Sequence, residues 1–303
     1  MSGAEADPSR ILTRVADEMQ RHLDAALAPG LYVVATPIGN LGDITLRALS
    51  VLARADILLC EDTRHSRTLL AHYGIGTPSR PYHEHNAARE RPRVLADLQA
   101  GRRVALISDA GTPLISDPGW KLVRESLDAG HRVEALPGAS ATLAALAVAG
   151  LPTDAFFFAG FLPPKTAGRR ARIAELAAVP ATLVVFEAPS RVAETLADLA
   201  QVLGDRPAAL ARELTKLHEE VRRAPLSSLA AQLDGETLKG EAVILVGPPR
   251  EANVTDADIA ARLEAALHSM SLRDAAKAVS EALGVPKTRV YDLGLRGARK
   301  DEK

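Results

Sequence analysis

Short apolar segments alternate with amphipathic segments over most of this 303-residue chain. Each apolar segment has the length of a β-strand and is continuous, which is typical of strands buried on both faces. Between these segments, apolar residues recur at helical spacing, as in 43–53, 121–129 and 191–203. The alternation predicts an α/β fold with largely buried sheets. The predicted strands are 31–35, 56–60, 102–107, 132–136, 155–160, 182–186 and 242–246.

Turn-rich breaks suggest how the chain is divided. Gly150-Leu151-Pro152-Thr153 separates the two halves of the strand-containing part, and Gly247-Pro248-Pro249 ends it. The residues that follow have an all-helical pattern. The stretch before residue 30 either forms a short amphipathic helix or is a frayed tail. The predicted organisation is an N-terminal extension (1–29), an N-terminal α/β domain (30–150), a C-terminal α/β domain (151–250) and a helical module (251–303).

Composition excludes several classes of protein. The 37 Lys and Arg residues nearly balance the 38 Asp and Glu residues, so the chain is not a globally basic nucleic-acid binder, although a local basic patch stays open. The single Cys60 excludes a disulfide framework and any CxxC site. No apolar run reaches the roughly 18–20 residues of a membrane span, and the N-terminus lacks a signal pattern. We therefore expect a cytoplasmic protein without a membrane anchor.

Polar loops follow several of the predicted strands, where open α/β sheets bind ligands. The loop Thr36–Asp43 could be an ordinary strand-to-helix turn that ends in a capping aspartate, and taken alone it favours that interpretation. The loop Ser108–Gly119 is more informative. It has twelve residues, with two Asp, two Gly, two Pro and three hydroxyls, whereas a plain connection needs roughly 2–6. This density favours a binding loop over a capped turn.

Three further loops carry polar or small residues. Leu136–Thr142 places small residues at a helix start, and Phe186–Arg191 is another strand-end turn. Gly160–Lys165 leads into a basic cluster of Lys165, Arg169, Arg170 and Arg172, which either binds phosphates or forms a solvated helix face. Common signatures are absent: the sequence has no GxGxxG after the first strand, no GxxxxGK[ST] and no GxSxG. His83 and His85 lack a third ligand nearby, so we expect no metal site.

Taken together, these loops resemble one family. The sequence is similar to the ribosomal RNA small subunit methyltransferase I family, a branch of the tetrapyrrole-methylase superfamily, over about residues 30–250. The resemblance implies two α/β domains with an S-adenosylmethionine cleft between them. It also implies 2′-O-methylation of a cytidine ribose in the decoding region of 16S rRNA in the small ribosomal subunit, and a homodimer. The motifs that carry it are ATPIGNLGDIT, CEDTRHSRTLL, SDAGTPLISDPG, LPGASA, GFLPPK and FEAPSR.

Carried over by position, the resemblance implies a set of cofactor-binding residues. Most of them belong to the first three loops, and the others lie across the expected cleft in the second α/β domain, where Glu187 and the Lys239-Gly240-Glu241 turn are further contacts. The cofactor-binding candidates are Pro37, Gly39, Asp109, Gly111, Thr112, Pro113, Ser116, Ser140, Ala141, Phe161, Leu162 and Gly240.

The C-terminal stretch resembles a helix-turn-helix. A capped helix at 271–279 is followed by the turn Leu283-Gly284-Val285-Pro286 and by a second helix with basic residues near its start. The alternative is a small helical cap with a basic tail. Because basic residues gather here in a nearly neutral chain, we favour contact with nucleic acid. The candidate RNA-binding residues of the whole chain are Arg64, Lys165, Arg169, Arg170, Lys287 and Arg289.

Methyl transfer to a ribose hydroxyl requires that the hydroxyl proton be removed, and a positioned base contributes roughly 10²–10⁴-fold. Glu61, Asp62, Asp109 and Glu187 all lie near predicted strand ends, and the sequence does not choose among them. We take Asp62, Asp109 and Glu187 as catalytic candidates, and we predict that Asp62→Ala or Asp109→Ala abolishes methylation with the fold retained. Two other functions stay open: a C-methyltransferase acting on a porphyrin-like tetrapyrrole, and a non-enzymatic RNA-binding module.

Overall fold

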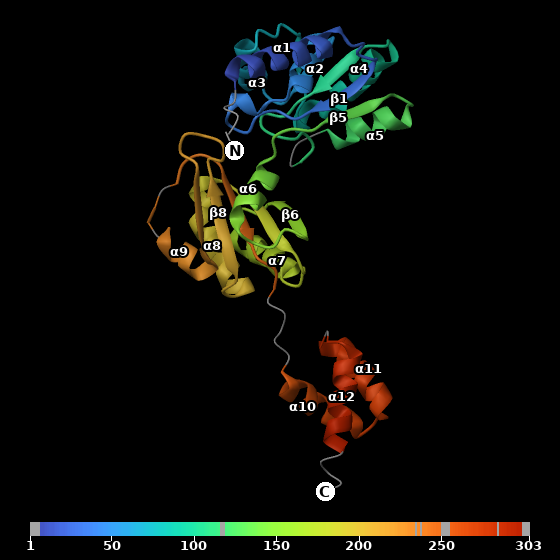
Figure 1. The fold of residues 1–303 in the computed structure, drawn as a ribbon, viewed down its shortest axis with the longest axis vertical. Coiled ribbons are helices and arrows are strands. Elements are labelled where there is room, and N and C mark those ends of the chain that lie inside the picture. The colour runs from blue at the N-terminus through green and yellow to red at the C-terminus, as the bar shows by residue number, and fades with distance from the viewer. Residues whose placement is uncertain are drawn as a thin grey trace. The chain divides into compact units, whose positions relative to one another are not determined.

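The computed structural model describes residues 7–115, 119–233, 235–236, 238–249, 255–283 and 285–298. The chain forms two compact units, residues 1–248 and 249–303. Within the described residues, the first unit contains two five-stranded sheets and the second contains three helices (Figure 1). The boundaries that the sequence suggests at residues 30, 151 and 251 stay predictions. Among the described residues, no helix has both the length and the apolar character needed to cross a bilayer.

The first sheet is entirely parallel and has the strand order β3-β2-β4-β1-β5. Leu31 of β1 packs in the core on one face, while Tyr32 and Val34 pack in the core on the other face. Burial on both faces explains why this strand is a continuous apolar run. The elements of this part are β1 (Gly30–Val34), β2 (Ile57–Cys60), β3 (Ser79–Pro81), β4 (Arg103–Leu106), β5 (Val133–Leu136), a 3₁₀ turn (Leu41–Asp43), α2 (Leu46–Arg54), α3 (Thr63–His72), α4 (Glu84–Gln99) and α5 (Trp120–Asp128).

The second sheet is mixed, with the order β6-β7-β10-β8-β9, in which only β6 and β7 run parallel. Helix α6 covers one face, and α7, α8 and α9 cover the other. Small side chains, among them Ala145, Ala149, Ala209 and Ala211, form the contact between α6 and the sheet. The elements are α6 (Ala141–Ala149), β6 (Phe156–Phe161), α7 (Thr166–Leu176), β7 (Thr182–Glu187), a 3₁₀ turn (Pro189–Arg191), α8 (Val192–Leu203), β8 (Pro207–Arg212), β9 (Glu220–Pro225), α9 (Leu226–Gln232) and β10 (Ala242–Val246).

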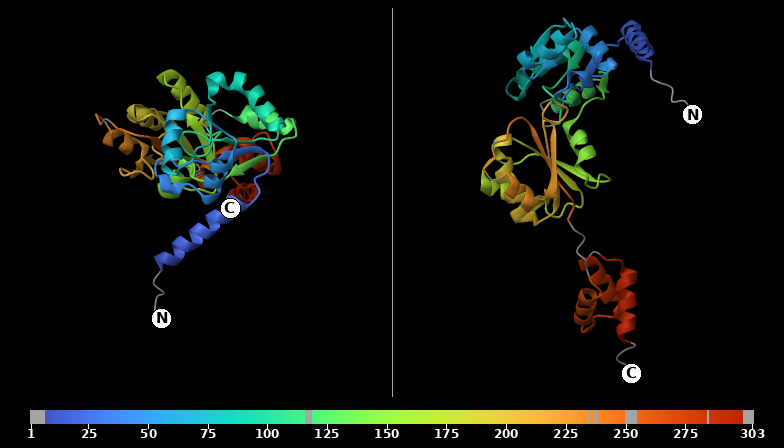
Figure 2. Two further views of the ribbon diagram at one scale, coloured as in Figure 1. Left: turned by 90° about the horizontal axis from the view of Figure 1, so that it is seen from above. Right: turned by 60° about the vertical axis from the view of Figure 1, so that its left-hand side comes forward.

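Helix α1 (Pro8–Asp24) shows that the N-terminal extension is helical rather than a frayed tail (Figure 2). The Asp7 carboxylate caps its start by accepting a hydrogen bond from the Ser9 N–H. Its last turn is attached to α2, because Ser50 Oγ and Arg54 Nη1 donate to the His22 carbonyl at 2.9 and 2.7 Å. The end of the helix is therefore held against α2.

The C-terminal unit consists of α10 (Asp256–Leu267), α11 (Leu272–Leu283) and α12 (Lys287–Ala298). These helices share a small core of their own, made of Ile259, Leu263, Ala275, Ala276, Val279 and Val290. Gly294 lets α12 approach α11 closely, since a Cβ atom at this position would overlap the Leu272 side chain. The three helices agree with the helical module that the sequence predicts.

An ion pair ties the start of β2 to the start of β4, and it makes stability depend on pH. Asp56 accepts hydrogen bonds from the Arg103 backbone N–H at 2.7 Å and from its Nη2 at 2.6 Å. Hydrogen bonding to the Arg103 guanidinium lowers the pKa of Asp56 to about 2. A lowered native pKa means that the stabilisation is present above the unfolded value of roughly 3.9 and is lost as the pH falls through the folded value.

We therefore expect Asp56→Asn to lower the free energy of unfolding at pH 6, and the deficit to shrink as the pH falls from about 4 towards 2. Urea unfolding of both proteins across this range measures the difference. Asp128→Asn, which breaks an exposed pair with Arg124, is the control and should change stability little at any pH. A deficit in Asp56→Asn that is equally large at pH 2.5 and pH 6 would contradict the assignment.

Candidate active site

The loops that follow β1, β4 and β5 are connected by hydrogen bonds. The Thr36 N–H donates to the Gly111 carbonyl at 2.9 Å, and the Gly111 N–H donates back to the Thr36 carbonyl at 3.0 Å. Thr112 Oγ1 donates to the Ala139 carbonyl at 3.2 Å, which joins the second loop to the third. Gly111 has a φ of +80° and packs against Ile38, so a side chain there would be strained and crowded. In their described residues, the three loops form one hydrogen-bonded surface at the carboxyl ends of the strands.

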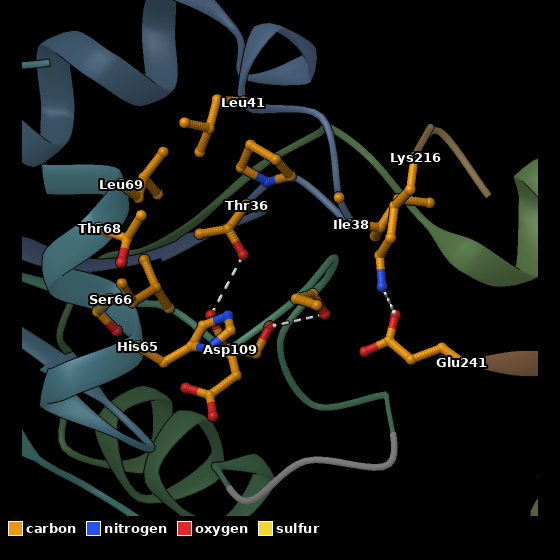
Figure 3. Close-up of a pocket in the computed structure, with 15 residues that line it drawn as sticks. Thr36, Ile38, Leu41, His65, Ser66, Thr68, Leu69, Asp109, Lys216 and Glu241 are labelled. Carbon is orange, nitrogen blue, oxygen red and sulfur yellow. Dashed lines mark hydrogen bonds and ion pairs between the residues drawn. The ribbon is translucent and has the colours of Figure 1, made fainter. Parts of the chain in front are cut away.

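Two cavities lie against this surface. The first has a volume of about 390 Å³ and is lined by residues of α3 and of loops next to both sheets (Figure 3). Its walls include Ile38 and Asp109 from the first part of the chain and Lys216 and Glu241 from the second. The full lining is Thr36, Pro37, Ile38, Gly39, Leu41, His65, Ser66, Thr68, Leu69, Ile107, Ser108, Asp109, Ala110, Lys216 and Glu241.

The second cavity has a volume of about 310 Å³ and is more apolar. Phe161 and Phe186 form an edge-to-face pair in its wall, with ring centroids 5.8 Å apart. The full lining is Ile38, Asp109, Ala110, Ile115, Ala141, Phe161, Phe186, Glu187, Ala188, Pro189, Gly240, Glu241, Ala242 and Val243. Four residues, Ile38, Asp109, Ala110 and Glu241, line both cavities and form their common wall.

The predicted cofactor-binding residues are distributed around these cavities. Pro37 and Gly39 line the first cavity, Asp109 lines both, and Ala141, Phe161 and Gly240 line the second. Gly111, Thr112, Pro113 and Ser140 lie in the connected loops, and Leu162 follows β6; none of these five lines either cavity. Ser140 caps α6, and the Leu162 side chain packs in the core of the second sheet. Ser116 lies outside the described residues.

Asp62 is engaged in capping α3, which argues against a catalytic role. Its carboxylate accepts hydrogen bonds from the Arg64 backbone N–H at 2.8 Å and from Arg64 Nη2 at 2.8 Å. Hydrogen bonding to Arg64 lowers the pKa of Asp62 to about 2, so the carboxylate is a weak base. In contrast, desolvation and the neighbouring charge of Asp109 raise the pKa of Glu61. Asp109 accepts a hydrogen bond from the Asp62 N–H at 3.1 Å and faces both cavities.

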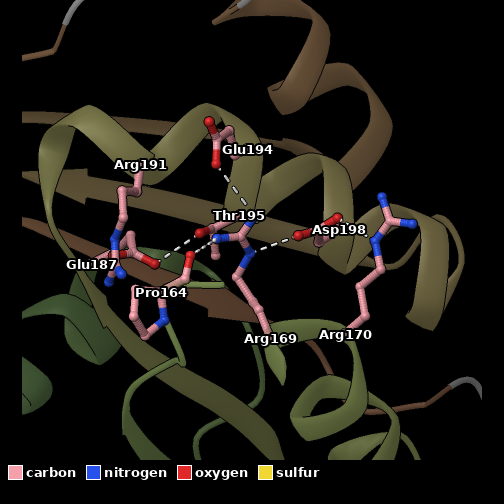
Figure 4. A network of polar contacts seen from close by, with 8 residues as sticks. All are labelled: Pro164, Arg169, Arg170, Glu187, Arg191, Glu194, Thr195 and Asp198. Atoms are coloured by element: carbon pink, nitrogen blue, oxygen red, sulfur yellow. Dashed lines mark hydrogen bonds and ion pairs between the residues drawn. The ribbon is translucent and has the colours of Figure 1, made fainter. Parts of the chain in front are cut away.

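Glu187 lines the second cavity, but its hydrogen bonds argue against the predicted catalytic role. Its carboxylate is buried, and both of its oxygens already accept hydrogen bonds, of which Figure 4 shows the one from Thr195. One oxygen accepts from the Ala188 N–H and from Arg191 Nε, both at 2.8 Å, and the other accepts from Thr195 Oγ1 at 2.7 Å. A carboxylate held in this way fixes the turn beside the second cavity, and it is poorly placed to take a proton from a substrate.

Arg169, predicted to bind RNA, is a buried structural residue. Its side chain is 1% exposed, and its Nε donates to Asp198 Oδ2 at 2.6 Å. Its other nitrogens donate to the Pro164 carbonyl at 3.2 Å and to Glu194 at 3.4 Å (Figure 4). Arg170 also forms an ion pair with Asp198, but its side chain is 44% exposed. Within the predicted basic cluster, Lys165 and Arg170 are accessible to a ligand and Arg169 is not.

In the C-terminal unit, Lys287 is exposed at the start of α12, whereas Arg289 forms an ion pair with Asp256. Arg289 Nη2 and Nε donate to the Asp256 carboxylate at 2.7 and 3.1 Å, which ties α12 to α10. Among the residues that the structure describes, no group of three or more His, Cys, Asp or Glu side chains is arranged to hold a metal ion.

The turn between β8 and β9 contains Glu213 and Lys216, which sequence reasoning missed and which form a polar cluster with Glu241. Lys216 Nζ donates to Glu213 Oε1 at 2.9 Å and to Glu241 Oε2 at 3.1 Å, while the Glu241 N–H donates to Glu213 Oε1 at 3.0 Å. Partial burial opposes the charged form of Lys216, but these hydrogen bonds outweigh it and raise the pKa of the ammonium. Glu213 and Thr215 adopt left-handed backbone angles, with φ of +50° and +66°. Gly240 allows the Glu213 carboxylate to lie against the backbone at 240, because a Cβ at Gly240 would overlap that carboxylate.

Comparison with known proteins identifies the family. Residues 30–230 match the family model of Tetrapyrrole (Corrin/Porphyrin) Methylases, and residues 253–298 match the RsmI C-terminal HTH domain. The Ribosomal RNA small subunit methyltransferase I of Mesorhizobium japonicum is 52% identical over 267 residues, which cover 88% of this chain and 91% of that protein. The chain belongs to the ribosomal RNA small subunit methyltransferase I family. This confirms the family that the sequence motifs indicate.

Other relatives agree with this assignment. The Ribosomal RNA small subunit methyltransferase I of Escherichia coli O157:H7 is 44% identical over 91% of this chain and 99% of that protein. Among solved structures, the uroporphyrin-III-C-methyltransferase from Thermus thermophilus matches with a TM-score of 0.52 and 25% identity, over 72% of this chain and 94% of that one. The predicted fold class, two tetrapyrrole-methylase α/β domains with a helix-turn-helix module, is confirmed.

Proposed function

We propose that this member of the ribosomal RNA small subunit methyltransferase I family methylates a cytidine of 16S rRNA in the decoding region of the small subunit. The acceptor is the ribose 2′-oxygen, and the donor is S-adenosylmethionine. Membership of the family makes the chain an rRNA methyltransferase. The observation that carries the finer proposal is the pair of adjoining cavities with Asp109 in their common wall. Two cavities with Asp109 between them can hold a donor and an acceptor on either side of one proton-accepting group.

The second cavity fits the donor. Its apolar and aromatic walls, including Phe161 and Phe186, suit a flat adenine ring. When bound, the sulfonium supplies a methyl group whose departure leaves a neutral thioether. The loops around Gly111 and Ala141 hold the walls in place, so the bound molecule is oriented before it reacts. Fixed orientation of this kind can lower a barrier by several kcal/mol.

The first cavity fits the acceptor. It is lined by polar side chains, among them His65, Thr68 and Lys216, and so suits a ribose and its neighbouring phosphate. Two carboxylates, Asp109 and Glu241, line both cavities. Glu241 is paired with Lys216, and Asp62 and Glu187 are paired with arginines, whereas Asp109 accepts a hydrogen bond from the Asp62 N–H. We assign to Asp109 the removal of the 2′-hydroxyl proton. The exposed basic residues Arg64, Lys165, Arg170 and Lys287 extend the RNA contact beyond the cavity.

The experiment that tests this function uses the purified protein and methyl-labelled S-adenosylmethionine. The acceptor is small ribosomal subunits from cells that lack the gene. We expect label in 16S rRNA, recovered after digestion as 2′-O-methylcytidine. Label in uroporphyrinogen offered in place of the subunits would instead support the tetrapyrrole alternative, which the helix-turn-helix match at residues 253–298 disfavours. Binding to subunits without transfer of label would support the non-enzymatic alternative.

We also propose that the protein acts as a cytoplasmic homodimer that pairs through the β6 edge of the second sheet. Strand β6 is an edge strand that pairs only with β7 in the described sheet. Two of its aromatic residues, Phe156 and Phe157, are 45% and 36% exposed. Apolar residues on an open edge strand favour pairing with another copy.

We expect Phe156→Asp to convert a dimer of the 32.1 kDa chain to a monomer in light scattering. Leu127→Asp, at an exposed leucine of α5, should leave the dimer intact, and a monomeric wild type would refute the proposal.

A further inference from the structure

Lys216 combines features that its role in folding does not explain. It lies in a turn whose neighbours Glu213 and Thr215 adopt left-handed backbone angles, and Thr215 Oγ1 is buried without a hydrogen-bond partner. Its aliphatic stem lies against Gly39, so closely that a Cβ at Gly39 would overlap the Lys216 Cγ. The second sheet thus extends a lysine across to a loop of the first, and the ammonium faces the first cavity.

The first cavity is lined by the carboxylates Asp109 and Glu241, so the phosphates of RNA need a positive charge there to offset the repulsion. Across the cavity from His65 and Asp109, the ion pair of Lys216 and Glu241 forms the opposite wall (Figure 3). In RNA, the carbon that carries the 2′-hydroxyl is bonded to the carbon that carries the 3′-phosphate oxygen. A ribose hydroxyl near Asp109 therefore brings a phosphate close to the carboxylates of Asp109 and Glu241, and both repel it. Among the described lining residues, Lys216 alone is positively charged throughout the neutral pH range.

We propose, building on the proposed function, that Lys216 is a positioning residue that contacts the phosphate next to the target ribose. In the RNA-free protein, Glu241 occupies the place of that phosphate. The Glu241 side chain is 69% exposed, so its ion pair with Lys216 is weak and exchangeable. Glu213 is only 18% exposed and also accepts the Glu241 N–H, so its contact with Lys216 persists and keeps the ammonium aimed at the cavity. Phosphate replaces Glu241 as the second partner.

The test compares Lys216→Met, which keeps the stem and removes the charge, with Lys216→Arg, which keeps a charge. Methyl transfer to small ribosomal subunits is measured at several salt concentrations, and cofactor affinity is measured by calorimetry. For Lys216→Met we expect the KM for subunits to rise about tenfold or more and the slope of log affinity against log salt to fall by about 0.7–0.9. The cofactor Kd should stay within about twofold of wild type. Lys216→Arg should recover most of the affinity, and Glu241→Gln should lower the KM by removing the competing carboxylate.

Lys121→Met removes an exposed lysine outside both cavities and is the matched control. The proposal is overturned if Lys216→Met has the wild-type KM and salt slope. It is equally overturned if this variant loses cofactor affinity and thermal stability as much as RNA affinity, because Lys216 would then only support the fold. Absence of methyl transfer by the wild type would instead refute the proposed function. Direct binding of subunits to both proteins would still decide the role of Lys216.

Discussion

Asp109→Asn is expected to lower kcat for rRNA methylation by about 10²–10⁴-fold, the range typical for loss of a positioned base. The substitution preserves the shape of the side chain, and its amide oxygen can still accept the hydrogen bond that Asp62 donates at 3.1 Å. The connected loops should therefore keep their structure. Single-turnover methylation of small ribosomal subunits measures the chemical step, and calorimetry with S-adenosylmethionine measures donor binding separately.

Asp62→Asn is the matched control for Asp109→Asn, because it removes a neighbouring carboxylate that caps α3. Asparagine is also a good N-cap residue, and losing the exposed pair with Arg64 should change the rate by no more than about threefold. This replaces the sequence-based prediction that Asp62 is essential. If Asp109→Asn weakens donor binding but leaves the single-turnover rate unchanged, Asp109 is a cofactor ligand and the base lies elsewhere, with Glu61 the next candidate.

Arg169→Ala is expected to lower the free energy of unfolding by about 3–5 kcal/mol, the usual cost of breaking a buried ion pair by removing one partner. The guanidinium is 1% exposed and its partner Asp198 is 4% exposed. Without Arg169, Asp198 keeps only Arg170, which is partly solvated. Urea unfolding monitored by circular dichroism gives the difference.

Arg172→Ala provides the control from the same helix, because Arg172 forms an exposed pair with Glu175 on α7. We expect it to change stability by less than about 0.5 kcal/mol. If Arg169→Ala were as stable as Arg172→Ala and instead weakened binding to ribosomal subunits, Arg169 would be a surface RNA contact, as the sequence alone suggests.

The sequence was informative where local chemistry dictates structure. The continuous apolar run of β1 needs two covered faces, and turn residues clustered after the strands of a parallel sheet meet at one edge. These two regularities predict the α/β class and bring the loops at Pro37, Asp109 and Ala141 together. The sequence also predicts the helices of the C-terminal unit, whose core residues recur at helical spacing.

The failures have equally specific causes. Strand β8 has an apolar run, but the run is mostly alanine, which has a low strand propensity, and β9 is a polar edge strand. Neither therefore has the pattern on which the strand predictions rest. Without these strands, the turn that carries Lys216 could not be placed beside Gly39. The burial of Arg169 depends on Asp198, 29 residues later on another helix, and periodicity does not reveal such a pairing. A capping carboxylate such as Asp62 resembles a catalytic one until its partners are known.

The common wall of the two cavities has a consequence for inhibitor design. Because Ile38, Asp109, Ala110 and Glu241 border both spaces, one compound could fill them together, with an adenosine head joined by a short tether to a cytidine-like tail. Tethering makes the second contact intramolecular, at an effective concentration in the millimolar range for a short flexible link. Such a compound would discriminate against methylases that share the head-binding space but take a different acceptor.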